Sequence, residues 1–307
     1  MKNLIVVWCL LGLLCAGQVM ACDLCAVYAA TEAQSGGGGG FYGGIAEQFT
    51  RYNTLQSSGR TVANDGEYID SSVSQVFVGY KVNERFGVQL NLPVIYRVYG
   101  SSAGGDHGEG GIGDASLIGN FLVYQEIEED FTFNWTTLGG IKFPTGDSHH
   151  LNPNEPDFAT GIGGHDLTLG SGSYDGLVGT GVFGRWKRLF LTANMQYTVR
   201  SEGSFDYQAA NDLSWSGGPG VYLVLGHACT VAAQCVISGE TKGQDTVKGV
   251  PTDDTAETIV YVGPQINVTW SSRLSAQAGA DLPVSIQSTG DQLVPDYRVH
   301  TAVTWRF

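Results

Sequence analysis

Apolar and polar residues alternate along much of this chain with a period of two, which is typical of β-strands that have one apolar face. The alternation is clearest over residues 86–99, where Phe86 and Val88 begin one face and Gln89 and Asn91 begin the other. Twelve such strands are predicted. They comprise residues 41–54, 67–81, 86–99, 112–124, 131–143, 172–186, 188–200, 212–225, 230–240, 256–270, 273–286 and 296–307.

The connections between these strands alternate in length. The short ones are predicted at residues 82–85, 125–130, 187, 226–229 and 271–272. The long, polar ones are predicted around residues 55–66, 100–111, 144–171, 201–211, 241–255 and 287–295. Short turns at one end and long loops at the other are typical of barrels in the bacterial outer membrane, where the long loops face outward.

A soluble β-sandwich can show the same alternation, so composition helps to separate the two classes. Only 15% of the residues are charged, against about 25% in ordinary soluble proteins. In hydrocarbon an unpaired strand edge is too costly to exist, so a sheet that spans a membrane has to close. The sequence therefore predicts an all-β fold, a closed antiparallel transmembrane β-barrel of about twelve strands over residues 41–307.

The first residues have the pattern of a signal peptide. Lys2 supplies a positive start, residues 4–16 are an apolar run, and Val19-Met20-Ala21 ends the segment on a small residue. We expect residues 1–21 to be removed, with lipoprotein processing at Cys22 as the alternative. Residues 22–40 then form a Cys-containing segment and a Gly-rich linker, either a periplasmic tail or a plug in the lumen.

Charge and the C-terminal residues indicate the partners. The formal net charge of −14 provides no basic stripe for phosphates, so nucleic acid is not expected. The last strand alternates up to a terminal aromatic residue, Phe307, which resembles the signal that the bacterial barrel-assembly machinery reads. The expected surroundings are outer-membrane lipid, and the expected location is the bacterial outer membrane.

Three cysteines are disulfide candidates. Cys22 and Cys25 have the spacing of a metal clip or redox pair, and Cys229 lies in a predicted turn at the same end of the barrel. In an oxidising compartment a disulfide is favoured; metal binding, redox chemistry and free thiols stay open. Cys235 is expected to face outward as a small apolar residue.

Histidines in the longest loop are weak metal candidates. His149, His150 and His165 lie there with nearby carboxylates, a combination that can bind zinc or copper. Acidic loops rich in Gly and Pro are usually only solvated, so we predict neither a metal nor a cofactor.

Every second residue of a strand faces the lumen, and this parity predicts which charged residues line the lumen near the loop end. These residues are Arg97, Asp114, Lys142, Asp175, Arg200 and Arg298. A ring of charge can set the ion preference of a pore. The alternative is that the six form ion pairs that stiffen the rim.

Several short motifs resemble the outer-membrane protein family named for the meta pathway of phenol degradation. They are Gly111-Ile112-Gly113-Asp114, residues 142–147 (KFPTGD), residues 169–175 (LGSGSYD), and the repeated Leu-Pro-Val at residues 92–94 and 282–284. The resemblance runs from about residue 41 to the end. It implies a barrel that passes small, often hydrophobic or aromatic, molecules.

Three classes of function stay open. We expect a channel or transporter for small solutes, because the predicted lumen is polar. The alternative is a structural or partner-binding barrel without transport. An enzyme is less favoured, because no Ser lies in a recognisable catalytic motif and the six His are scattered.

Overall fold

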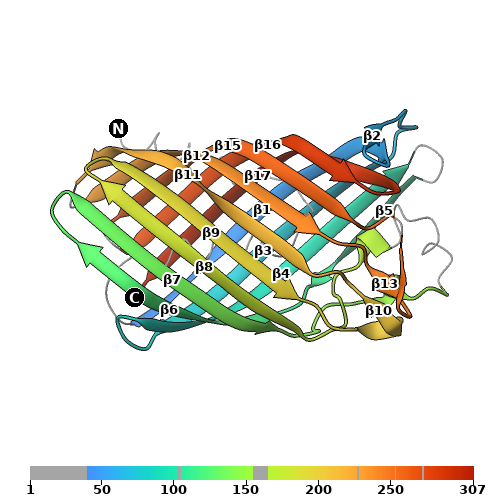
Figure 1. Cartoon of the computed structure of the whole chain (residues 1–307), viewed down its shortest axis with the longest axis horizontal. Helices are drawn as coiled ribbons and strands as arrows, with labels where there is room; N and C mark the ends of the chain where they lie inside the picture. Colours follow the sequence, from blue (N-terminus) through green and yellow to red (C-terminus); the bar gives the residue numbers. More distant parts are fainter. Residues whose placement is uncertain (1–39, 102–104, 155–164, 227, 253, 272) are drawn as a thin grey trace, which may run out of the picture.

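The chain forms a closed β-barrel (Figure 1). The structure, a computed structural model, describes residues 40–101, 105–154, 165–226, 228–252, 254–271 and 273–307. Twelve strands make the wall, in the order β1 (Gly40–Ser57), β3 (Tyr68–Lys81), β4 (Phe86–Ser101), β6 (Ser116–Ile127), β7 (Phe131–Lys142), β8 (Asp175–Trp186), β9 (Leu189–Val199), β11 (Asp212–Leu225), β12 (Cys229–Lys242), β15 (Glu257–Trp270), β16 (Leu274–Ser288) and β17 (Asp291–Arg306). The predicted fold class is confirmed.

Pairing between the first and last strands closes the sheet. β1 runs antiparallel to β17, with Tyr42 opposite Arg306 and Ser57 opposite Asp291. Every other neighbouring pair in the wall is also antiparallel. Closure satisfies the backbone groups of both edges, as a sheet in lipid requires.

One predicted loop contains a strand. Residues 100–111 were expected to be an irregular loop, but β5 (Gly105–Ile112) pairs with the extended end of β4. The wall then has an irregularity between Ile112, opposite Val94, and Ser116, opposite Asn91. One extra residue on this side makes a bulge, which is a common device at the rim of a barrel.

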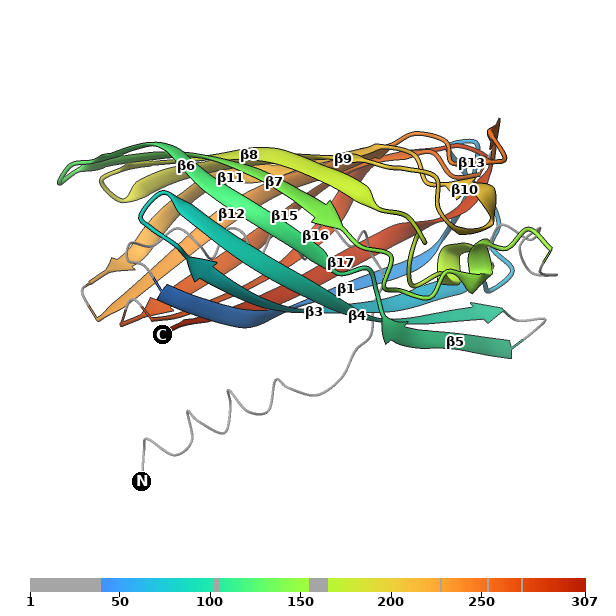
Figure 2. The same ribbon diagram turned by 90° about the horizontal axis from the view of Figure 1, so that it is seen from below.

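The long connections gather at one end of the barrel, here called the loop end, and the short turns gather at the other, the turn end (Figures 1 and 2). At the loop end, β5 and the smaller elements extend beyond the wall. The smaller elements are β2 (Arg60–Thr61), η1 (His149–Leu151), η3 (His165–Leu167), η4 (Ser204–Asp206), β10 (Tyr207–Gln208), β13 (Thr246–Val247) and β14 (Val250–Pro251).

The outward face of the wall is apolar. Exposed side chains alternate along each strand, as with Leu90, Leu92 and Val94 of β4. Exposed aromatic residues at the turn end include Phe41, Tyr80, Phe86, Trp186, Trp270, Trp305 and Phe307, and those nearer the loop end include Tyr96, Tyr174 and Tyr297. An apolar band between two aromatic girdles is the surface of a transmembrane barrel.

Glu47 is an exception on this outward face. It lies on β1 between the outward Ile45 and Phe49, and its carboxylate accepts hydrogen bonds from the hydroxyls of Ser72 and Ser74 on β3. The hydroxyls partly replace the water that a carboxylate in an apolar band would lose. Among the described residues, no helix is long and apolar enough to cross a membrane.

The inward face is polar. Its most buried side chains include Gln48, Thr50, Gln75, Gln89, Asn91, Gln196, Thr198, Gln234, Gln265 and Thr304. Within the part of the chain that the structure describes, buried apolar residues form small groups rather than one central core, such as Ile118 with Leu177 and Tyr42 with Phe77. Polar side chains on the inner wall suit a lumen that contains water.

Candidate functional site

The long connection between β7 and β8 turns into the lumen at the loop end. Leu169 packs against Val73 and Ile95, which lie on the inward faces of β3 and β4. Leu151 and Leu167 of the same connection are also buried. Burying these apolar side chains favours the inward position of the loop. The described part of this loop, residues 143–154 and 165–174, therefore narrows the lumen.

Asp114 fastens this loop. The residue sits at the bulge between β5 and β6, and its carboxylate accepts the backbone N–H of Gly146 at 3.0 Å and that of Ser171 at 2.9 Å. The Ser171 hydroxyl donates to the same carboxylate at 2.8 Å. Asp114, Gly146 and Ser171 each belong to one of the motifs that carry the family resemblance. Three of these motifs thus meet at the Asp114 carboxylate.

Close backbone contact explains two glycines in these motifs. A Cβ on Gly146 would lie 2.5 Å from the carbonyl oxygen of Leu169, and one on Gly170 would lie 2.6 Å from Asp114 and 2.7 Å from the backbone of Gly146. All three distances are too short for a Cβ atom, so no residue with a side chain fits at either position. Glycine is needed here because two segments of the loop pass with their backbones in contact.

A chain of buried ion pairs extends from Asp114 along the rim. The Lys142 ammonium lies 2.5 Å from Asp114 and 2.8 Å from Asp175, and the three side chains are at most 6% exposed. Arg200 continues the chain, with nitrogen–oxygen distances of 3.1 Å to Asp175 and 2.7 Å to Asp212. We call these five residues the rim network. Each base contacts two carboxylates, as desolvated charges require.

Four of the six predicted charged residues therefore come together: Asp114, Lys142, Asp175 and Arg200. Arg97 is not part of the rim network. Its guanidinium donates to the backbone carbonyl of Asp166 at 2.8 Å and to that of Thr168, so it holds the loop from β4. The six side chains do not form one ring; whether they set the properties of a pore stays a prediction.

Arg298 belongs to a second polar centre, on β12, β15, β16 and β17. Its guanidinium donates to Asp281 at 2.8 and 2.9 Å and to the Ser238 hydroxyl at 2.7 Å, and it lies 4.1 Å from the centre of the Tyr261 ring. His300 lies 3.4 Å from the same carboxylate. A charged, stacked and hydrogen-bonded arginine of this kind is held in one orientation.

A cavity adjoins this second centre. It has an empty volume of about 670 Å³, part of it open to the lumen, and its lining includes Ala46, Gln48, Tyr261, Gln265 and Arg298. The acids Glu240 and Asp281 also line it, so apolar, amide, aromatic and oppositely charged groups face one space. This combination can hold a small molecule that has both an apolar and a polar part.

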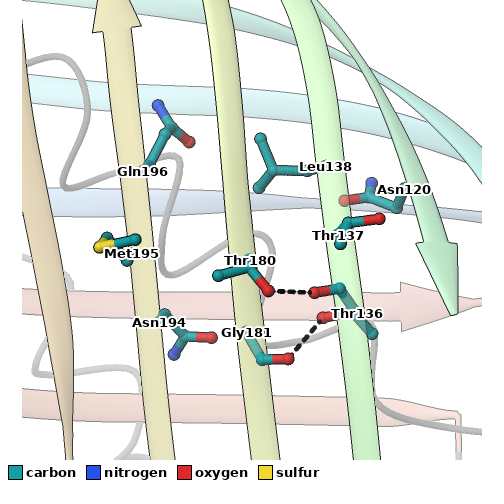
Figure 3. Close-up of a pocket in the computed structure, with 9 residues that line it drawn as sticks. All are labelled: Asn120, Thr136, Thr137, Leu138, Thr180, Gly181, Asn194, Met195 and Gln196. Carbon is teal, nitrogen blue, oxygen red and sulfur yellow. Dashed lines mark hydrogen bonds between the residues drawn. The ribbon is translucent and has the colours of Figure 1, made fainter. Parts of the chain in front are cut away.

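A smaller hollow lies along the wall formed by β7, β8 and β9 (Figure 3). The Thr180 hydroxyl donates to the Thr136 carbonyl at 2.9 Å, and the Thr136 hydroxyl to the Gly181 carbonyl at 3.2 Å. Asn194 and Gln196 of β9, with Asn120 of β6 and Thr137 of β7, add to its polar lining. The hydrogen bonds stiffen the wall, and the lining is uncharged, so we assign the hollow no role of its own.

The structure places only part of the cysteine prediction. Cys229 begins β12 at the turn end, half-buried and unpaired among the described residues, whereas Cys22 and Cys25 lie outside them. The disulfide thus stays a prediction. Cys235 is exposed on the outward face, as expected.

The three candidate histidines separate into two groups. His165 lies 3.2 Å from the adjacent Asp166. His149 and His150 of η1 lie side by side with their ring centres 3.9 Å apart, and Glu109 of β5 approaches His150. No local pattern connects Glu109 with these histidines, because their contact depends on how two loops pack.

Two further acids of the site were missed although a signal for them existed. Asp212 and Asp281 lie on strands that were predicted, and parity places both on the inward face. Each is the counter-ion of a predicted base, Arg200 or Arg298. The alternation that predicted the inward acids Asp114 and Asp175 applies equally to Asp212 and Asp281.

Comparisons with known proteins concern the fold. No protein-family model and no curated protein matches the chain. Among solved structures, the chain is similar to an outer-membrane channel from Pseudomonas putida F1, with 14% identity and a TM-score of 0.64 over 89% of this chain and 98% of that one. The translocator domain of the autotransporter NalP from Neisseria meningitidis has 12% identity and a TM-score of 0.47, over 92% and 93%.

The closed wall, the apolar outward band and the aromatic girdles define the class of this protein. It is an outer-membrane β-barrel, and its location is the bacterial outer membrane. The structure from Pseudomonas putida F1 has the same fold. The resemblance to the family of the meta pathway of phenol degradation stays a prediction.

Proposed function

We propose that this barrel is a channel that passes small solutes, hydrophobic or aromatic ones included, across the outer membrane. The observation that carries the proposal is the polar inner wall, seen in Gln75, Gln89, Gln196 and Gln265. Side chains just fill a barrel of eight strands. Twelve strands enclose a wider space, and amide side chains facing it are consistent with a path through water.

The loop between β7 and β8 is the proposed constriction. Two residues from adjacent parts of the wall hold it: Asp114 through Gly146 and Ser171, and Arg97 through the carbonyls of residues 166 and 168. A solute would have to pass beside this loop or displace it. The cavity next to Arg298 and Tyr261 combines apolar, aromatic and amide groups, and this supports a solute that has both an apolar and a polar part.

Conductance in planar lipid bilayers tests the channel. The full chain should give discrete, repeatable current steps, and liposomes that contain it should swell in small aromatic acids faster than in disaccharides. A structural or partner-binding barrel would give neither current nor swelling, even though it folds and shifts its mobility on gels when heated. That outcome would replace transport with the structural alternative.

We also propose that Phe307 is read during assembly. Its side chain is exposed at the turn end, and its backbone N–H donates to the Phe41 carbonyl at 3.0 Å, beside the seam where β17 meets β1. Deleting Phe307 should lower the amount of folded barrel in the outer membrane without changing the fold of the fraction that assembles. Replacing Phe307 with Tyr should restore assembly; unchanged assembly after the deletion would contradict the role.

A further inference from the structure

Two adjacent histidines and a glutamate meet at the loop end, outside the lumen site described above. His149 and His150 lie on η1, and Glu109 lies on β5. One nitrogen from each imidazole and one oxygen of the carboxylate all lie within 4.8 Å of one another. Nε2 of His150 is 3.4 Å from Oε1 of Glu109. Glu109 is 40 positions before His149 in the sequence, so only folding brings the glutamate to the two histidines.

The scaffold holds these ligands in place. Leu151 is buried directly after the histidines, and its backbone N–H donates to the Ser148 carbonyl at 3.0 Å. The N–H of His149 donates to the Asp147 carboxylate at 2.9 Å. Glu109 is fixed by the pairing of β5 with β4, where it stands opposite Arg97. Ligands held before binding favour a specific site.

The imidazole of His150 lacks the hydrogen bond that its burial calls for. Its Nε2 atom is buried, and none of the described residues makes a hydrogen bond to it, although Glu109 is close. Buried polar atoms in native proteins nearly always have a partner. A cation between this nitrogen and the Glu109 carboxylate would use both groups at once.

The surrounding charge favours a divalent cation. Glu109 and Asp147 are both acids, and Oδ2 of Asp147 lies 3.1 Å from Nδ1 of His149. Asp147 also accepts the backbone N–H of His149 at 2.9 Å, so its carboxylate is held beside the two imidazoles. Two carboxylates thus lie beside the two imidazoles, and carboxylate oxygens favour a cation as their partner.

We propose that Glu109, His149 and His150 bind one divalent transition-metal ion, Zn²⁺ or Cu²⁺. Imidazole nitrogens with one carboxylate oxygen suit these ions, whereas Ca²⁺ and Mg²⁺ prefer oxygen ligands alone. The bound ion would join η1 to β5, so it would fasten the long loop to the rim at a point separate from Asp114. The site does not depend on whether the barrel conducts.

Metal binding by the full chain, folded in detergent without a His tag, tests the site. After treatment with chelator, equilibrium dialysis against Zn²⁺ and elemental analysis should give one ion per chain. His150→Ala and Glu109→Gln should each weaken binding at least about tenfold, the lower end of the loss seen when residues behind metal ligands are removed. With Cu²⁺, the electron paramagnetic resonance spectrum of the wild type should show coupling to two nitrogens.

Two controls keep the test specific. His107→Ala removes an exposed histidine from the same strand, β5. His165→Ala removes a largely buried histidine from the same loop as His149 and His150. Both variants should bind like the wild type, and the heat-shifted gel mobility of every variant should report a folded barrel.

The proposal is overturned if the wild type binds no stoichiometric ion, or if either control weakens binding as much as His150→Ala does. If His150→Ala does not fold, Glu109→Gln on the exposed strand decides the outcome.

Discussion

The carboxylate of Asp114 accepts the backbone N–H of Gly146 at 3.0 Å, although the two residues are 32 positions apart. This contact joins the bulge in the barrel wall to the start of the long loop. Ser171, at the end of the same loop, donates to the other oxygen of the carboxylate. Asp114, at the bulge between β5 and β6, thus holds both ends of the loop.

Asp114→Ala should release the loop. The substitution removes three hydrogen bonds to the loop and one of the two carboxylates beside Lys142. Breaking a buried ion pair costs about 3 kcal/mol or more; because Asp175 still contacts Lys142, we expect about 3 kcal/mol. Denaturant unfolding measures this loss, and limited proteolysis should show faster cleavage within the long loop. Asp291→Asn, at an exposed acid, is the control; cleavage at the wild-type rate in Asp114→Ala would count against the fastening role.

Gly170→Ala should disturb the same contact by steric overlap. Its Cβ would lie 2.6 Å from an oxygen of Asp114 and 2.7 Å from the backbone of Gly146. Overpacking of this kind costs about 1–3 kcal/mol. Gly176→Ala is the matched control, since its Cβ would come no closer than 3.8 Å to Val199. Unfolding in denaturant should therefore shift for Gly170→Ala alone, and equal midpoints for the two variants would refute the steric explanation.

Arg200→Gln should move the ion preference of a conducting barrel towards cations. The rim network holds three carboxylates and two bases, so its net charge is one negative, and the substitution makes it two. Charged groups in a pore set which ions it prefers. The reversal potential in a salt gradient measures the shift. Arg188→Gln makes the same change of charge at the turn end and should have a smaller effect. If both variants keep the wild-type reversal potential, the rim network has only a structural role.

The loop end should face the outside of the cell. A cysteine placed at Asn154, which is exposed at the loop end, should react with a membrane-impermeant maleimide on intact cells. A cysteine at Glu84, exposed in a short turn, should react only after the cells are broken. Both probes need a background without the native cysteines. The reverse pattern of labelling would invert the orientation.

Cys22 and Cys25 should be oxidised in the mature protein, to each other or with Cys229. Cys229 is half-buried at the turn end, the end expected to lie in the oxidising periplasm. Intact-mass measurement after alkylation should show two further labels per chain once a reductant has been used, one for each thiol of the disulfide. Cys235, on the outward face, has no predicted partner and serves as the internal reference. Alkylation of all four thiols without reductant would exclude the disulfide.

Local pattern in the sequence was sufficient for the barrel wall. The alternation that begins at Phe86 and Val88 predicted β4, and the contrast between short turns and long loops predicted twelve strands. Both signals are short-range: a strand between lipid and water must alternate, and lipid forces the sheet to close. The same parity identified the inward charges, four of which meet in the rim network, and it applies equally to the acids that were missed, Asp212 and Asp281.

The tertiary structure alone decided how the loops pack and which charges meet. Arg97 and Lys142 were both predicted to face inward, yet Arg97 binds loop carbonyls and Lys142 binds carboxylates. Arg298, also predicted to face inward, pairs with Asp281 in a separate centre. Parity sets the face of a strand, but the depth and the neighbours of a side chain depend on the stagger between strands and on loops that turn inward. The contacts of Asp114 with Gly146 and of Glu109 with His150 have no local pattern, because each joins segments that only the closed barrel brings together.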